Sequence, residues 1–79
     1  MTPPITIRES RDTDIAQLWR LAQLDSAPML EGPSLIAEYD GRAVAALSLD
    51  GARAIADPFE PTQGILALLR TWASQLRSS

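Results

Sequence analysis

The chain has 79 residues and a net charge of −3, and it contains neither cysteine nor histidine. A chain of this length forms one domain, here residues 1–79, and buries only about 60–65% of its unfolded surface, so association would add stability. The missing side chains exclude disulfides, thiol nucleophiles, imidazole acid–base catalysis and the usual nitrogen or sulfur ligands of zinc. All seven basic residues are arginines scattered along the chain, which argues against nucleic-acid binding.

Membrane and export signals are not recognisable in the sequence. No apolar run approaches the roughly 18–20 residues that a membrane span requires. The opening MTPPITIRES has neither the basic start nor the apolar centre of a signal peptide. The sequence therefore predicts no membrane span and a cytoplasmic location.

The first segment predicts a short strand. Pro3 and Pro4 cannot donate to a ladder, so residues 1–4 are expected to form a flexible tail. Ile5 to Arg8 then alternates apolar and polar residues with β-branched side chains, which favours a strand at the edge of a sheet.

The next segment predicts an amphipathic helix of about three turns. Asp12 and Asp14 are interpreted as helix-start residues rather than as a metal-binding or catalytic pair, because carboxylates there accept free N–H groups and complement the helix dipole. The apolar positions have helical spacing and end before Pro28, which disfavours further helix. They comprise Ile15, Leu18, Trp19, Leu21, Ala22 and Leu24.

Residues 34–57 carry three apolar runs separated by Asp40-Gly41 and Asp50-Gly51. Asp-Gly between apolar runs is the strongest short-range signal for a two-residue hairpin loop, because both loop residues need positive φ. The sequence therefore predicts a meander of three strands, over 34–39, 42–49 and 52–57.

Two-residue loops would also fix the register of this meander. The pairs expected across the strands are Tyr39–Arg42, Ala37–Val44, Leu35–Ala46, Leu49–Ala52 and Leu47–Ala54. One face of the sheet would then carry Leu35, Ala37, Val44, Ala46 and Ile55. The other face is also apolar, so both are expected to be covered.

The C-terminal segment predicts a second amphipathic helix over 62–77, with Thr62 as a favoured N-cap. Its Trp72, like Trp19, is expected in the core, and the alternative is an interface, where tryptophan is enriched. Phe59 lies between two prolines and is expected to plug the end of the core. The apolar stripe of the helix comprises Ile65, Leu68, Leu69, Trp72, Ala73 and Leu76.

The predicted order is strand, helix, three strands, helix. This order predicts an α+β domain with a four-stranded, mainly antiparallel sheet (β-α-β-β-β-α), whose two faces are covered by the two helices.

Three passages resemble the front half of the Gcn5-related N-acetyltransferase (GNAT) fold. ITIRESRDTDIAQLWRLAQLD is similar to that family's first strand and acidic helix start, and SLIAEYDGRAVAALSLDG is similar to its V-A-E-x-D-G-x-x-V-A hairpin. AIADPFEPTQGILALLRTWASQLR is similar to a strand of the family followed by proline and a Leu-rich helix. The resemblance covers nearly the whole chain but only about half of the family's fold.

The resemblance implies an acetyl-CoA site in the loop that opens the last helix, where the family has a Q/R-x-x-G-x-G/A pattern that holds the pyrophosphate. Here that loop reads EPTQGI, with one glycine and with Pro61 removing an N–H donor. Gln63 and Gly64 are the candidate cofactor residues if acetyl-CoA binds, and otherwise an ordinary first helical turn. Tyr39 does not match the place of the family's acid tyrosine, so no catalytic or metal-binding residue is assigned.

Two functional hypotheses remain. The first is a non-catalytic, minimal GNAT-like domain that acts through protein association, as a homodimer or on a larger partner. Its expected interface is the open edge of the last strand, with Ala52, Ala54 and Ala56, or the second helix with Trp72 as anchor. The second hypothesis is an N-acetyltransferase or acyl-CoA-binding protein that completes its site across a dimer.

Overall fold

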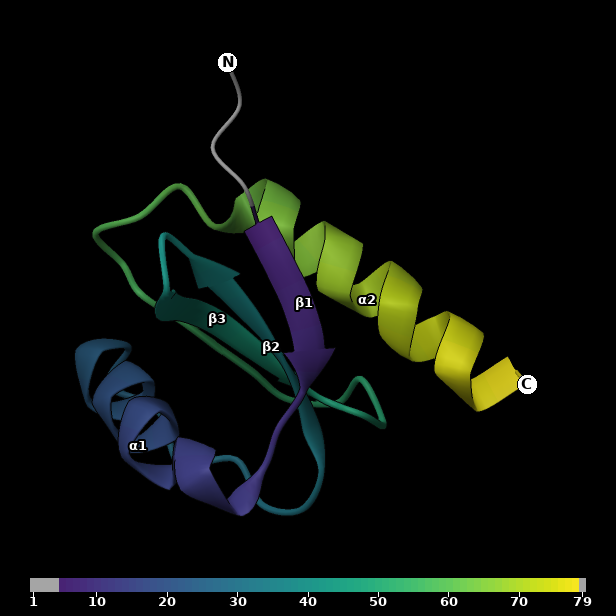
Figure 1. Cartoon of the computed structure of the whole chain (residues 1–79), viewed down its shortest axis with the longest axis horizontal. Helices are drawn as coiled ribbons and strands as arrows, with labels where there is room; N and C mark the ends of the chain where they lie inside the picture. The colour runs from purple at the N-terminus through teal and green to yellow at the C-terminus, as the bar shows by residue number, and fades with distance from the viewer. Residues whose placement is uncertain (1–4, 79) are drawn as a thin grey trace.

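Four antiparallel strands and two helices make up residues 5–78, which are the residues described in the computed structural model (Figure 1). The strands are β1 (Ile5–Glu9), β2 (Ser34–Tyr39), β3 (Arg42–Ser48) and β4 (Ala54–Ala56); the helices are α1 (Ile15–Leu24), after a 3-10 turn over Asp12–Asp14, and α2 (Gln63–Ser78). The sheet order is β1-β2-β3-β4. The predicted α+β class and element order are confirmed, as is the place of β1 at an edge. The tail predicted over residues 1–4 lies outside the described residues.

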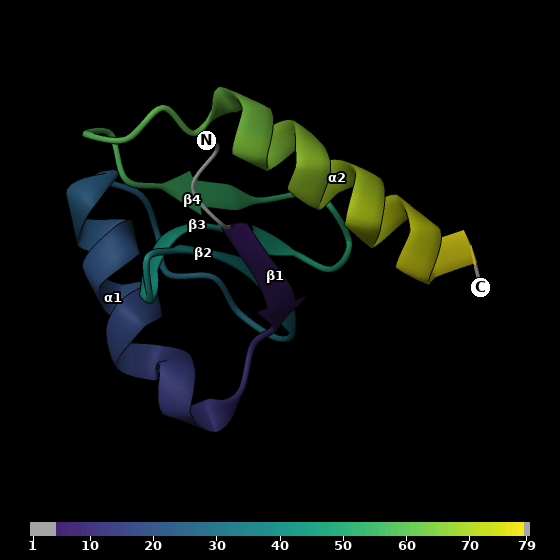
Figure 2. The ribbon, with the colours of Figure 1, turned by 45° about the horizontal axis from the view of Figure 1, so that its top comes forward.

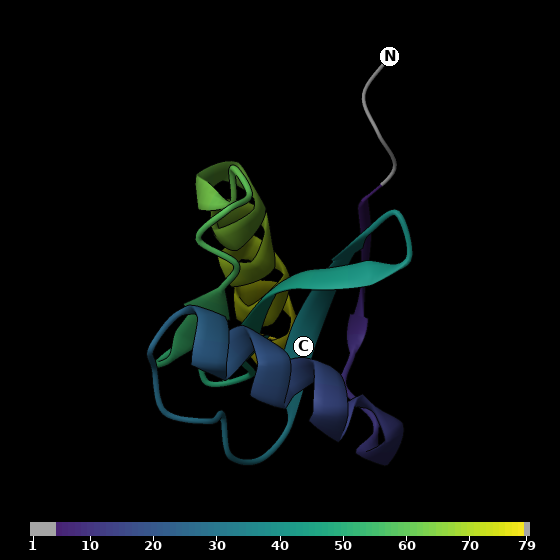
Figure 3. The same cartoon turned by 90° about the vertical axis from the view of Figure 1, so that its left-hand side faces the viewer.

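The two helices lie on opposite faces of the twisted sheet (Figures 2 and 3). The core is therefore divided into two clusters. The α1 cluster contains Leu18, Leu21, Ala22, Leu30, Ile36, Ala43, Ala46 and Ile55. The α2 cluster contains Leu35, Ala37, Val44, Ala45, Leu47, Leu69 and Ala73. The prediction that both faces are covered is confirmed, because each apolar face of the sheet packs against its own helix.

A β-bulge in β3 changes the predicted register. Glu38 pairs with Ala43 but Ala37 pairs with Ala45, so Val44 is an extra residue in β3. From Ala37 back to Ser34, each residue of β2 therefore pairs with the β3 residue one position later than predicted. The bulge also changes which side chains share a face, and the set predicted for one face is wrong: Leu35, Ala37 and Val44 face α2, whereas Ala46 and Ile55 face α1. The carbonyl of Val44 accepts the N–H of Asp57 at 2.9 Å.

The two Asp-Gly turns differ. Asp40 and Gly41 have φ values of 54° and 78° and form the predicted two-residue loop between Tyr39 and Arg42. Gly51 also has a positive φ, 76°, but this loop spans residues 49–53. The predicted Leu47–Ala54 pair is present. The predicted Leu49–Ala52 pair is not, because the N–H of Leu49 donates to the carbonyl of Pro33 at 3.1 Å.

Helix α2 agrees with its predicted bounds, 62–77, to within one residue, and α1 ends before Pro28 as predicted. After α1, Ser26 adopts the left-handed conformation with φ 51°, and the N–H of Ala27 donates to the carbonyl of Ala22 at 2.9 Å, a pattern common where helices stop. At the start of α2, the carbonyl of Thr62 accepts the N–H of Leu66 at 2.8 Å. Among residues 5–78, no helix is long and apolar enough to span a bilayer.

Three aromatic residues contradict the core predicted from the sequence. Trp19 is 53% exposed and Trp72 is 43% exposed, and Phe59 does not plug the core because it is 82% exposed. The physical reason is the same for both tryptophans: each lies at the margin of an apolar helix stripe that is wider than the strip of sheet beneath it. The interior is filled by smaller residues, mostly leucine and alanine.

Candidate functional site

Helix α2 presents a row of large apolar side chains at the surface. Leu68, Trp72 and Leu76 are 44%, 43% and 43% exposed and are spaced four residues apart on one side of the helix. Leu69 and Ala73, one position further round the helix, are fully buried. We call Leu68, Trp72 and Leu76 the outer stripe of α2.

The hydrogen bonds of two arginines show how α2 is turned on the sheet. Arg70 Nη1 donates to the carbonyl of Gly51 at 3.1 Å, and Arg77 Nη1 donates to the carbonyl of Leu49 at 3.0 Å. Both bonds reach the loop between β3 and β4. Two residues along a helix correspond to about 200° of rotation, so Trp72 lies roughly 160° around the helix from Arg70. The outer stripe therefore lies on the flank turned away from that loop.

No acidic residue lies on α2, and its two arginines lie off the outer stripe. Arg70 and Arg77 are the two charged residues of α2, and all ten acidic residues of the chain lie between Glu9 and Glu60. Thus α2 carries +2, while five arginines and ten acidic residues give −5 elsewhere, which together make the net charge of −3. Centres of protein interfaces are depleted in charge and enriched in tryptophan, and this side of α2 has both properties.

The edge of β4 is a smaller surface than the sequence predicts. The strand spans Ala54–Ala56 rather than residues 52–57. Ala54 and Ala56 are half-buried and pack against the α2 cluster, while Ala52 is exposed in the loop. The outward N–H of Ala56 donates to Asp25 Oδ2 at 3.2 Å. A short edge with one N–H already paired offers little backbone for strand addition, so we consider α2 the stronger candidate interface.

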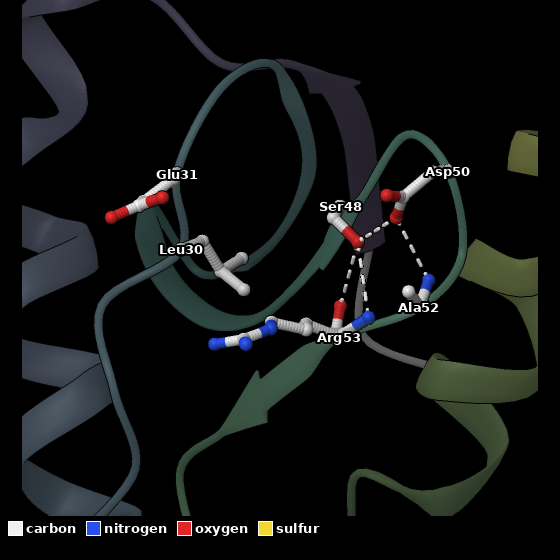
Figure 4. A pocket seen from close by; sticks show the side chains of 6 residues that line it. All are labelled: Leu30, Glu31, Ser48, Asp50, Ala52 and Arg53. Atoms are coloured by element: carbon white, nitrogen blue, oxygen red, sulfur yellow. Dashed lines mark hydrogen bonds between the residues drawn. The ribbon is translucent and has the colours of Figure 1, made fainter.

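A polar pocket lies beside this edge, between residues 30–31 and the β3–β4 loop (Figure 4). It measures about 200 Å³ and is lined by Leu30, Glu31, Ser48, Asp50, Ala52 and Arg53. Ser48 Oγ donates to Asp50 Oδ1 at 2.6 Å, and the N–H of Ala52 donates to the same oxygen at 2.9 Å. These two bonds hold the pKa of Asp50 below its usual value, and the bond from Ser48 makes the larger contribution. The carboxylate is thus engaged in shaping the loop.

The candidate cofactor residues are accessible but isolated. Gln63 and Gly64 are exposed in the first turn of α2. A Cβ atom at Gly64 would meet nothing within 4 Å, so close packing does not require glycine there. Pro61 supplies no N–H at this end. Gln63 and Gly64 therefore stay candidate cofactor residues only for the alternative in which acetyl-CoA binds.

A second apolar surface lies on the opposite face, beside α1. Trp19 and Ile15 are 53% and 54% exposed. They border a cleft of about 560 Å³ between the start of α1 and the 29–33 segment. Among residues 5–78, no group of three or more acidic side chains is placed to hold a metal ion.

An ion-pair network that the sequence did not reveal positions α1 against the sheet. Arg8 of β1 contacts Asp14 through two bonds, of 2.8 and 2.7 Å, and contacts Glu38 of β2 at 3.1 Å. The Arg8 guanidinium, followed by the N–H of Arg11, lowers the pKa of Asp14 to about 2 against the opposing effect of burial. The two carboxylates in turn raise the pKa of Arg8. Asp14 thus serves as the predicted helix-start residue and also as a link to β1.

The structure separates the predicted interface residues into two surfaces. Ala52, Ala54 and Ala56 lie at the β4 edge and its loop, whereas Trp72 lies on the flank of α2 turned away from that loop. The exposure of Leu68 beside Trp72 was not predicted from the sequence. The apolar arc of α2 is wider than one stripe facing the core, and this width could have indicated an exposed apolar side.

Comparisons with protein-family models, with curated proteins and with solved structures give no match to this chain. The relationship to the GNAT family therefore rests on the three sequence passages, and it stays a prediction.

Proposed function

We propose that this chain is a non-catalytic, minimal GNAT-like domain that acts through protein association, as a homodimer or on a larger protein partner. The observation that carries the proposal is the outer stripe of α2, where Leu68, Trp72 and Leu76 are each more than two-fifths exposed on a helix without acidic residues. Exposed apolar patches that are rimmed by polar residues commonly mark the sites where proteins bind other molecules.

The small size of the chain supports the same proposal. Among residues 5–78, the buried core contains 15 apolar residues, six of them alanines. Small domains bury a low fraction of their surface, so covering an exposed tryptophan and leucines adds proportionally more stability than in a large protein.

The alternative proposal is an acyl-CoA-binding protein or N-acetyltransferase that completes its site in a dimer. The observation in its favour is the open start of α2, where Gln63 and Gly64 are exposed and a helix N-terminus attracts phosphate. Against it, the sequence offers no histidine, cysteine or lysine as a base or nucleophile.

Acetyl-CoA titration distinguishes the two proposals. We expect no heat of binding in calorimetry with acetyl-CoA up to millimolar concentration, because Pro61 and the single glycine leave few N–H donors for the pyrophosphate. A dissociation constant in the low micromolar range that weakens in Gly64→Val would contradict the association proposal and favour the acyl-CoA alternative. Ser74→Val, on the same helix but away from its start, is the matched control.

A further inference from the structure

We infer that the outer stripe of α2 binds the same stripe of a second copy of this chain, with the two helices antiparallel about a two-fold axis near residue 70. This inference rests on the proposed association function and names its partner. Such an interface is isologous, so each residue contact must occur twice.

The spacing of the apolar residues is what makes the stripe self-complementary. Ile65 is half-buried on the same side of α2 and extends the outer stripe toward the helix start. In an antiparallel pair, Leu68 would face Trp72 of the second copy, and Ile65 would face Leu76 of the second copy. The residue numbers of these facing pairs add to 140 and 141, so one register satisfies both pairs within a single residue. Both pairs consist of apolar side chains, so the seam between the two helices would be apolar along its length.

The charge distribution favours a second copy in this position. A chain with net charge −3 repels its own copy, and the repulsion is weakest where the negative charges are farthest from the contact. No acidic residue lies on α2, and Arg70 and Arg77 are on the flank that bonds the β3–β4 loop. Two copies that meet through the outer stripe therefore bring no acidic side chain of α2 to the contact. The outer stripe has no charged side chain with which a partner could form ion pairs.

The outer stripe alone is too small for a stable interface, so a second surface must contribute. A stable interface buries about 800 Å² per partner, against 5084 Å² of surface for the whole chain. Helix α2, with 16 residues, is about 24 Å long, and a seam of that length alone falls short. The half-buried Ile5 and Ile7 of β1 border the same core cluster. Strand β1 is the edge of the sheet farthest from β4. The outer stripe is turned toward the β1 edge, so Ile5 and Ile7 supply further apolar area.

The first experiment measures dimerisation by sedimentation equilibrium of the full chain and of four variants, one of which, Ala54→Pro, blocks strand pairing at the β4 edge. Trp72→Gln should weaken the dimer at least about 30-fold, because a central tryptophan anchor contributes 2 kcal/mol or more. Leu68→Gln should weaken it in the same direction. Trp19→Gln is the matched control, since it removes the other tryptophan, which is 53% exposed on the opposite face, and it should leave the dimer unchanged.

The second experiment tests the antiparallel arrangement. Because the chain contains no cysteine, a single introduced cysteine reports one position. Position 71 lies within about 2 Å of the two-fold axis, measured along the helix. The cysteines of two Thr71→Cys copies should therefore be cross-linked by a short bismaleimide. Gln75→Cys should not, because its two copies would be about 14 Å apart along the helices.

The outcomes separate this inference from the proposed function. Cross-linking of both cysteine variants would indicate parallel helices and contradict the antiparallel register. A dimer that survives Trp72→Gln but dissociates in Ala54→Pro would contradict the inference and keep the association function, with β4 as the interface. A chain that is monomeric at every concentration would overturn the inference, and the acetyl-CoA titration would then decide the proposed function independently.

Discussion

The two helices cover opposite faces of one sheet, but they are attached by different means. Helix α1 is linked by polar contacts to three strands: Asp14, directly before it, bonds Arg8 of β1, Arg20 bonds the carbonyl of Ala43 in β3, and Asp25 bonds the N–H of Ala56 in β4. Helix α2 is fixed mainly by apolar packing of Leu69 and Ala73, and its two arginines reach a single loop.

The difference explains where an interface can form. A helix attached by directional bonds at its start, middle and end has its orientation fixed from within the chain. A helix attached through one buried row can leave the rest of its apolar arc available to a second molecule. The directional bonds to the sheet are therefore concentrated on α1, whereas the exposed apolar arc lies on α2, where we propose that association occurs.

The largest expected effect contrasts two adjacent leucines of α2. Leu69 is fully buried, so Leu69→Ala should lower the free energy of unfolding by about 2–4 kcal/mol through lost burial and a residual cavity. Leu68→Ala removes a side chain that is 44% exposed and should cost less than about 1 kcal/mol in the monomer. Urea melts at the lowest workable concentration measure both. Equal losses for the two variants would show that the assigned orientation of α2 is wrong.

Gly51→Val tests the contact between α2 and the β3–β4 loop. Gly51 has φ 76°, which strains a β-branched residue, and a Cβ there would meet Arg77 Nη1 at 2.7 Å. We expect a loss of about 1–2 kcal/mol, measured by urea melts, because the backbone is strained and Arg77 must leave its bond to Leu49. Gly64→Ala is the control, since its site is open and helical. Full retention of stability in Gly51→Val would contradict the turn assignment.

The attachment of α1 should depend on pH in the acid range. The pKa of Asp14 is lowered to about 2 in the folded state, so the unfolded chain binds the proton more readily. The stabilisation is therefore fully present above pH 4 and is lost as the pH falls through 2. We expect a loss of about 1–2 kcal/mol, reduced by screening because the Arg8 side chain is 25% exposed.

A matched variant isolates this effect. Asp14→Asn should be less stable than the natural chain at pH 6 and should show a shallower fall between pH 4 and pH 2 in thermal melts followed by circular dichroism. An unchanged slope in Asp14→Asn would mean that other carboxylates cause the acid sensitivity.

Sequence patterns predicted the elements because local residues determine them. Apolar spacing located both helices, and Asp40-Gly41 located the first turn, since positive φ at both positions selects that pair. The α+β order followed from these elements. These parts of the fold depend on interactions only a few residues apart in the chain.

The errors arose where distant contacts decide the outcome. The bulge at Val44 allows its carbonyl to accept the N–H of Asp57, and nothing in the local sequence marks it. The exposure of Trp19 and Trp72 depends on how much sheet lies beneath each helix, which the helix sequence alone does not contain. The same limit applies to the candidate interface: the sequence named Trp72, but only the arginine bonds to the β3–β4 loop locate the flank on which it lies.

The smallest expected effect concerns a polar group on the α1 face that lacks a partner. Ser34 is fully buried two residues before Ile36, and its Oγ is the one buried side-chain polar atom without a hydrogen bond among residues 5–78. An unpaired buried hydroxyl costs about 1–3 kcal/mol in desolvation, and alanine removes it while keeping the strand backbone. Ser34→Ala should therefore raise the free energy of unfolding by about 1 kcal/mol in urea melts. Ser48→Ala is the paired control and should instead destabilise, because Ser48 Oγ bonds Asp50 and accepts the N–H of Arg53 at 3.1 Å. A loss of stability in Ser34→Ala would mean that this hydroxyl is hydrogen-bonded in solution, and that the α1 face pairs all of its polar groups.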